Sequence, residues 1–131
     1  MSLVVVAPRD DDQARAAREA DARNALLGAG ADALPRPPWA RGAQPPAASE
    51  LVRFALWRAA GGSLDEDGVL AALALLPAVR AEADELEAGV LLSARAAGLS
   101  WSRISAALGL SSPQAAQQRF DRVTGRLDGR S

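Results

Sequence analysis

Apolar residues recur at helical spacing from residue 49 onward. Leu51, Phe54 and Ala55 keep the i, i+3, i+4 interval that places side chains on one face of a helix. The pattern predicts a helix that begins at about Ser49 and ends at Gly61–Gly62, since paired glycines favour the end of a helix.

A second and a third helix are expected between residues 63 and 97. Ser63–Glu66 matches a capping box, in which a side-chain oxygen accepts a hydrogen bond from the backbone of the first turn, and Asp65 is an alternative cap. This helix should run to about Leu76. Pro77 fits the first turn of a new helix, where its missing N–H costs nothing, and that helix should end near Ala97.

Two shorter helices should follow, joined by a tight glycine turn. Ser100 is suited to begin the first, Gly109 to end it, and Ser112 followed by Pro113 to begin the second, which should continue to about Leu127. The inward positions of the second helix are Ala116, Phe120, Val123 and Leu127. Two short helices across a turn, with a polar outer face on the second, are typical of a helix-turn-helix that contacts DNA.

The first 48 residues differ in composition from the rest. Residues 11–27 are good helix formers, but their apolar face is mostly alanine, which predicts a marginal helix. Residues 35–46 contain five prolines and should form an extended linker. We therefore expect a flexible or marginally helical arm and linker over residues 1–48. An all-α domain of about five helices should cover 49–131, with the helix-turn-helix at about 84–127 and no β-wing.

The chain of 131 residues contains no Cys, His or Tyr. Disulfides, zinc sites built on Cys or His, and Ser-His-Asp or Cys-His catalysis are thereby excluded. We expect no catalysis, no cofactor and no metal. The longest apolar run, about 11 residues, is shorter than the roughly 20 that a bilayer requires, and the first residues lack a signal-peptide pattern. A cytoplasmic, nucleoid-associated protein without membrane contact is the expectation.

Charge is unevenly distributed along the chain, although the total is only −1. Residues 1–89 hold nine arginines and fourteen carboxylates, whereas residues 90–131 hold six arginines and two carboxylates. A positive C-terminal third is consistent with a surface that binds nucleic acid.

Candidate DNA contacts follow from the helical period of the last helix. If Ala116 and Phe120 face inward, glutamines and an arginine face outward. Gln can bond adenine N6 and N7, Arg can bond guanine O6 and N7 or a phosphate, and a helix N-terminus favours anions. The candidate residues are Arg103, Ser112, Gln114, Gln117, Gln118 and Arg122. Asp121 flanks this face and would repel phosphates. The alternative interpretation is an ordinary solvated helix surface.

The same segment resembles a helix-turn-helix found in many small DNA-binding proteins and regulators of actinobacteria, and is similar in outline to the promoter-reading end of sigma factors. The matching residues are Ala94–Trp101, Ile104, Ala107–Leu110, Gln114–Ala116 and Arg119–Phe120. The resemblance implies a homeodomain-like three-helix unit whose last helix enters the major groove. Pro113 departs from the family pattern, which has Arg at this position.

We therefore expect sequence-selective binding of double-stranded DNA, in the role of a transcriptional regulator. A single helix-turn-helix makes few phosphate contacts, so a homodimer or a partner such as RNA polymerase or a sigma factor is expected. The expected second surface consists of Leu51, Phe54, Trp57 and Leu70. The main alternative is a module that docks on a sigma factor or RNA polymerase without a DNA site, and the next is a helical accessory domain.

Overall fold

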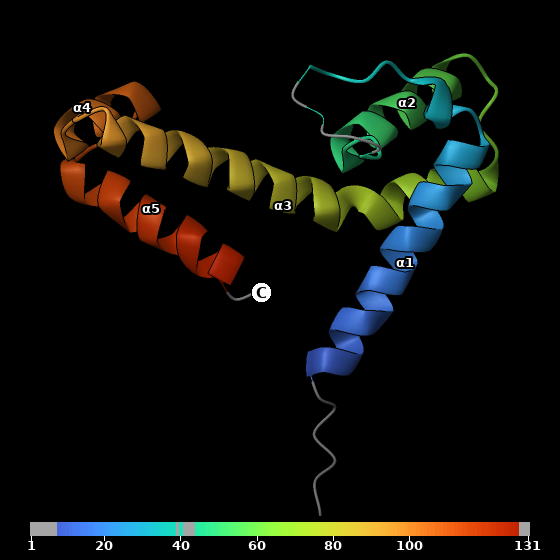
Figure 1. Cartoon of the computed structure of the whole chain (residues 1–131), viewed down its shortest axis with the longest axis horizontal. Helices are drawn as coiled ribbons and strands as arrows, with labels where there is room; N and C mark the ends of the chain where they lie inside the picture. Colours follow the sequence, from blue (N-terminus) through green and yellow to red (C-terminus); the bar gives the residue numbers. More distant parts are fainter. Residues whose placement is uncertain (1–7, 39, 41–43, 129–131) are drawn as a thin grey trace, which may run out of the picture. The chain divides into compact units, whose positions relative to one another are not determined.

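The computed structural model describes residues 8–38, 40 and 44–128, with side chains over 11–38, 40 and 44–126. This part of the chain contains helices and no strand, so the expected all-α fold of about five helices is confirmed. The first seven residues of the expected arm and the side chain of Leu127 lie outside the description. The elements are α1 (Pro8–Gly28), the 3-10 helix η1 (Ala31–Ala33), α2 (Ala48–Ala60), α3 (Glu66–Ala96), α4 (Trp101–Leu108) and α5 (Pro113–Asp128) (Figure 1). Within these ranges, no helix has the length and apolarity needed to cross a membrane.

Contacts divide the chain into two compact units, residues 1–79 and residues 80–131. Each unit has its own buried cluster, and α3 contributes residues to both clusters. The boundary expected at residue 48 was drawn from composition and stays a prediction.

The first unit is built around side chains from α1, α2 and the first half of α3. Leu26, Leu51 and Leu75 are fully buried together. Arg23 of α1 donates to the carbonyl of Pro46, over 2.8 Å between its Nη1 and the oxygen, and so links α1 to the segment before α2. Of the two states expected for the arm, flexible or helical, residues 8–28 take the helical one.

The expected break between two helices at Leu76 and Pro77 is wrong, because α3 continues without interruption from Glu66 to Ala96. A proline inside a helix removes one backbone hydrogen bond and costs about 3 kcal/mol. This cost does not by itself end a helix when side chains on both sides of the proline are buried. Burial of Leu75 on one side and Leu91 on the other favours helix on both sides of the proline.

The start of α3 distinguishes between the two caps that the sequence allowed. The backbone N–H of Gly68 donates to Oδ1 of Asp65 over 2.9 Å, so Asp65 is the cap. Ser63 has a different role, because its hydroxyl donates to the carbonyl of Arg58 at the end of α2.

The second unit packs α4 and α5 against the last part of α3. Figure 1 shows α5 running back beside α3, with α4 at the far end of the pair. Leu91, Ile104 and Ala116 form the buried centre, one from each helix. The rings of Trp101 and Phe120 lie beside this centre with their centroids 5.8 Å apart. Helix α5 is therefore held from behind by apolar contacts, with its opposite side outward.

Candidate nucleic-acid interface

Short-range hydrogen bonds define both ends of the segment that joins α4 to α5. Ser100 begins α4, because its hydroxyl accepts from the backbone N–H of Arg103 over 3.1 Å. Gly109 ends the helix with a φ of 74°, a left-handed conformation that glycine adopts without steric cost. Ser112 then begins α5, and its hydroxyl accepts from the N–H of Ala115 over 3.1 Å. The helix ends expected at these positions are confirmed.

A buried hydroxyl that sequence analysis missed holds this connection in place. Ser105 of α4 is only 3% exposed, and its Oγ lies 2.7 Å from the carbonyl oxygen of Ser112 and 3.2 Å from that of Leu110. The single hydroxyl proton is thus positioned between two acceptors in the connecting segment. The only sequence signal was a polar residue directly after the inward-facing Ile104, which is too weak to identify such a contact.

The two sides of α5 differ as the helical period predicts. Ala116 and Val123 are fully buried, and Phe120 is half-buried. The opposite side carries polar side chains that are all exposed: Gln114, Gln117, Gln118, Asp121 and Arg122. Four of the six candidate residues therefore share one exposed face of a single helix, and Asp121 lies among them.

The two remaining candidates lie outside this face. Arg103 is exposed on α4, in a different helix from the glutamines. Ser112 is half-buried at the start of α5, where its oxygen already accepts from Ala115. The Ser112 hydroxyl could therefore still donate a hydrogen bond to a phosphate oxygen.

Two arginines of α5 pair with carboxylates of α3. Nη2 of Arg119 lies 2.9 Å from Oε1 of Glu87, and Nη2 of Arg126 lies 3.1 Å from Oδ1 of Asp84. These ion pairs connect residues 32 and 42 positions apart in the sequence, and sequence analysis did not find them. Two of the six arginines of residues 90–131 are thus paired with negative charges. The whole second unit, residues 80–131, holds seven arginines and six carboxylates, so its net charge is small.

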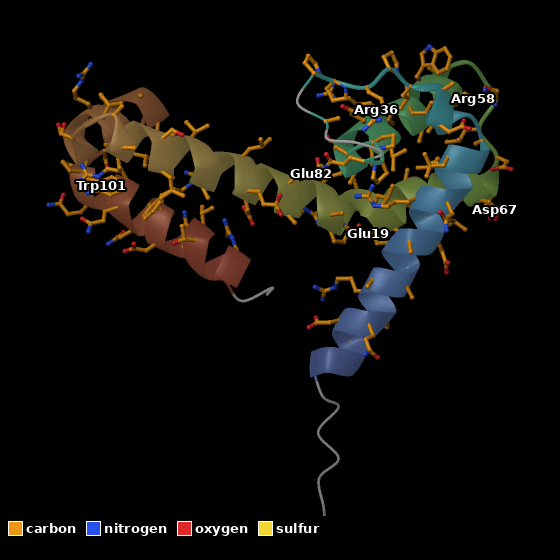
Figure 2. The ribbon with its side chains drawn as sticks, viewed as in Figure 1. Glu19, Arg36, Arg58, Asp67, Glu82 and Trp101 are labelled. Atoms are coloured by element: carbon orange, nitrogen blue, oxygen red, sulfur yellow. The ribbon has the colours of Figure 1, made fainter. Side chains whose placement is uncertain are left out.

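A third arginine stabilises the junction between α3 and α4. The guanidinium carbon of Arg95 lies 4.8 Å from the ring centroid of Trp101, which Figure 2 labels, and its Nη1 donates to the carbonyl of Leu99 over 2.8 Å. A cation near the C-terminus of α3 is also favoured by the helix dipole. Arg95 therefore has a structural role in orienting α4.

The expected second surface is only partly exposed. Leu51 and Phe54 belong to the buried cluster of the first unit, so that part of the expectation is wrong. Both are buried because Ala22 and Leu26 of α1 pack in the same cluster, and local sequence patterns do not indicate this cover. Trp57 and Leu70 are exposed as expected.

No family model, curated protein or solved structure matches this chain.

Proposed function

We propose that this protein binds double-stranded DNA sequence-selectively through α5, as a nucleoid-associated transcriptional regulator without catalytic activity. One observation carries the proposal. The exposed face of α5 presents three glutamines and Arg122, while the opposite face is fixed by the buried Ala116 and Val123. A rigid helix with bidentate hydrogen-bonding groups along one side fits the major groove.

The proposed contacts divide the face into two parts. Gln114 and Gln118 lie one helical turn apart, so both can reach base edges in the groove, where the amide groups would pair with adenine N6 and N7. Arg122, one turn further, would bond guanine or a phosphate. Each bidentate contact contributes about 1–3 kcal/mol of discrimination between base pairs.

Contacts to the phosphate backbone would come from the edges of the α4–α5 pair. Arg103 supplies a cation from α4, and Ser112 with the first N–H groups of α5 supplies donors at the positive end of a helix dipole. Pro113 contributes no N–H, so this cluster of donors is smaller than in a helix without proline at its first position.

The small net charge of residues 80–131 favours a second candidate function, docking on a sigma factor or RNA polymerase. Protein interfaces need no excess of cations, whereas the affinity of a DNA-binding surface depends strongly on them. The same outer face of α5 would then contact a polypeptide, and its glutamines would have no preference among DNA sequences.

Selection of bound sequences from a random pool of duplex DNA tests the proposal. The full chain should enrich one sequence, and the Gln118→Ala/Arg122→Ala variant should bind that sequence about 30- to 20,000-fold more weakly, since two contacts of about 1–3 kcal/mol each are lost. A matched control is Gln13→Ala/Arg15→Ala, which makes the same chemical changes at exposed positions of α1 and should bind as the unchanged chain does. The proposal fails if no sequence is enriched, or if both variants bind the enriched sequence equally well.

A further inference from the structure

The first half of α3 carries apolar side chains on the side that faces solvent. Its inner side holds Ala71 and Leu75, which are buried in the cluster of the first unit. Leu73 lies about 160° around the helix from both of them, and 56% of it is exposed. Val69 and Leu70, one turn before Leu73, are 45% and 55% exposed. Large apolar side chains that gather in solvent on one side of a helix mark an interaction surface.

Opposite charges lie at the two ends of these apolar positions. Glu66 is seven positions before Leu73, and Arg80 is seven positions after it, on a helix that continues without interruption between them. Seven residues are close to two full turns, so each charged residue lies within about 20° of Leu73 around the helix. Both side chains are exposed, and no ion pair of the described residues involves either of them. The two charges are thus symmetric about Leu73 in position and opposite in sign.

We infer that the face of α3 centred on Leu73 binds the same face of a second copy of the chain, with the two helices antiparallel. This Leu73 face consists of Glu66, Val69, Leu70, Leu73, Pro77 and Arg80. An interface between two identical faces has a two-fold axis and closes on itself. Around an axis at Leu73, a residue before it meets the residue equally far after it in the other copy. Glu66 would thus lie opposite Arg80 of the second copy, and the dimer would contain this pair twice.

The positions of the charges favour a second copy in the antiparallel direction. A parallel pair would bring Glu66 beside Glu66 and Arg80 beside Arg80, which is unfavourable. A two-fold axis requires opposite charges at equal distances from its centre, whereas a different partner protein places no such requirement on this chain. Further along the same side of α3, Asp84 and Glu87 already pair with arginines of α5. The part of this side that stays open therefore runs from the start of α3 to Arg80, and the antiparallel pair uses that part.

The size of the Leu73 face predicts a weak dimer. Residues 66–80 cover about 21 Å of helix at a rise of 1.5 Å per residue, and one helix face of that length buries less than the ~800 Å² per partner of a standard interface. Association should therefore depend on concentration. The interface does not require the proposed DNA binding; if that function holds, the dimer would carry two copies of α5, as a palindromic site requires.

Sedimentation equilibrium of the full chain across a range of concentrations tests the inference. The unchanged chain should approach twice its monomer mass, whereas Leu73→Glu should stay a monomer, because the two-fold axis places two carboxylates opposite each other. Leu86→Glu is the matched control, since Leu86 is 71% exposed on the same helix but outside the Leu73 face, and it should still dimerise. Circular dichroism checks that each variant is helical. The inference fails if the unchanged chain stays monomeric, with its face left to another protein, or if Leu73→Glu and Leu86→Glu associate equally.

Exchange of the two charges gives a second test, which a loss of folding cannot imitate. Glu66→Arg and Arg80→Glu should each weaken association about tenfold, because each dimer then contains two pairs of like charges. The chain with both substitutions should associate as the unchanged chain does, since opposite charges again lie opposite each other. Asp67→Arg makes the same change at an exposed position outside the Leu73 face and should leave the dimer intact. Single variants that associate as the unchanged chain does, or a double variant no stronger than the singles, overturn the inference.

The Leu73→Glu monomer also separates the two proposals. If α5 binds DNA, this variant should still enrich a single half-site in the selection from random duplexes, whereas the unchanged chain should enrich a palindrome. DNA binding without any dimer overturns only the present inference, and a dimer that enriches no sequence overturns only the proposed function.

Discussion

The hydroxyl of Ser105, in the middle of α4, lies 2.7 Å from the carbonyl oxygen of Ser112, the residue that begins α5. Ser112 in turn caps α5 through Ala115. The position of the exposed face of α5 relative to α4 therefore depends on a chain of two hydrogen bonds, in addition to the apolar contacts around Ile104.

Removing this hydroxyl should weaken the second unit. We expect Ser105→Ala to lower the free energy of unfolding by about 1 kcal/mol, because the hydrogen bond from this buried hydroxyl to the α4–α5 connection is lost. Urea denaturation followed by circular dichroism measures the change. Ser102→Ala, an exposed serine on the same helix, should change the free energy of unfolding by less than about 0.5 kcal/mol. Equal effects of the two substitutions would show that Ser105 has no special role.

The cap of α3 offers a comparison between two nearby polar residues. Asp65→Ala should destabilise the chain by about 1 kcal/mol, since the N–H of Gly68 loses its acceptor. Ser63→Ala should cost less, because Ser63 is exposed and its hydroxyl donates to the end of α2. Thermal melting of both variants gives the order. A larger loss for Ser63→Ala would favour the capping box that the sequence allowed.

The ion pair between Arg119 and Glu87 should couple the stability contributions of α5 and α3. A double-mutant cycle with Arg119→Ala and Glu87→Ala should give a coupling free energy of about 0.2–1 kcal/mol, since both side chains are partly exposed. High salt should reduce the coupling. The same cycle with Arg103→Ala and Glu87→Ala is the control and should be additive.

DNA affinity should depend on salt in proportion to the number of phosphates that the protein contacts. We expect the logarithm of the binding constant to fall linearly with the logarithm of salt concentration, and Arg103→Ala to reduce the slope by about 1. Fluorescence anisotropy on the enriched duplex measures both slopes. Arg53→Ala, an exposed arginine of α2, should leave the slope unchanged. An affinity insensitive to salt would contradict binding through phosphates.

Replacing the proline inside α3 should stabilise the protein. Pro77→Ala restores a backbone donor and raises helix propensity at an exposed position, so the free energy of unfolding should rise by about 1–3 kcal/mol. Chemical denaturation measures the change. Ala83→Gly, at an exposed position of the same helix, should shift the stability in the opposite direction by about 1 kcal/mol. A less stable Pro77→Ala variant would show that the chain requires the proline ring.

Signals that lie within a few residues of each other were sufficient to predict much of the second unit. Ser100, Gly109 and Ser112 were identifiable as helix ends because caps depend on neighbouring backbone groups. The exposure of Gln114 and Gln118 followed from the helical period once Ala116 was placed inward.

Features that depend on distant residues could not be predicted in this way. The partner of Arg119 is 32 positions away, and its identity depends on how α5 packs against α3. The burial of Leu51 depends on the cover that α1 provides, although the alanine-rich face of α1 gave little sign of tertiary contact. The continuity of α3 through Pro77 depends on packing on both sides of the proline, whereas the sequence pattern indicates only its local cost.

Structural and exposed side chains are interleaved along α5, and this has a consequence for engineering. The side chains at 116, 119, 120 and 123 contact the rest of the fold, whereas those at 114, 117, 118 and 122 point into solvent. A library randomised at the second set alone should therefore keep the fold, and it could yield variants with altered binding preferences.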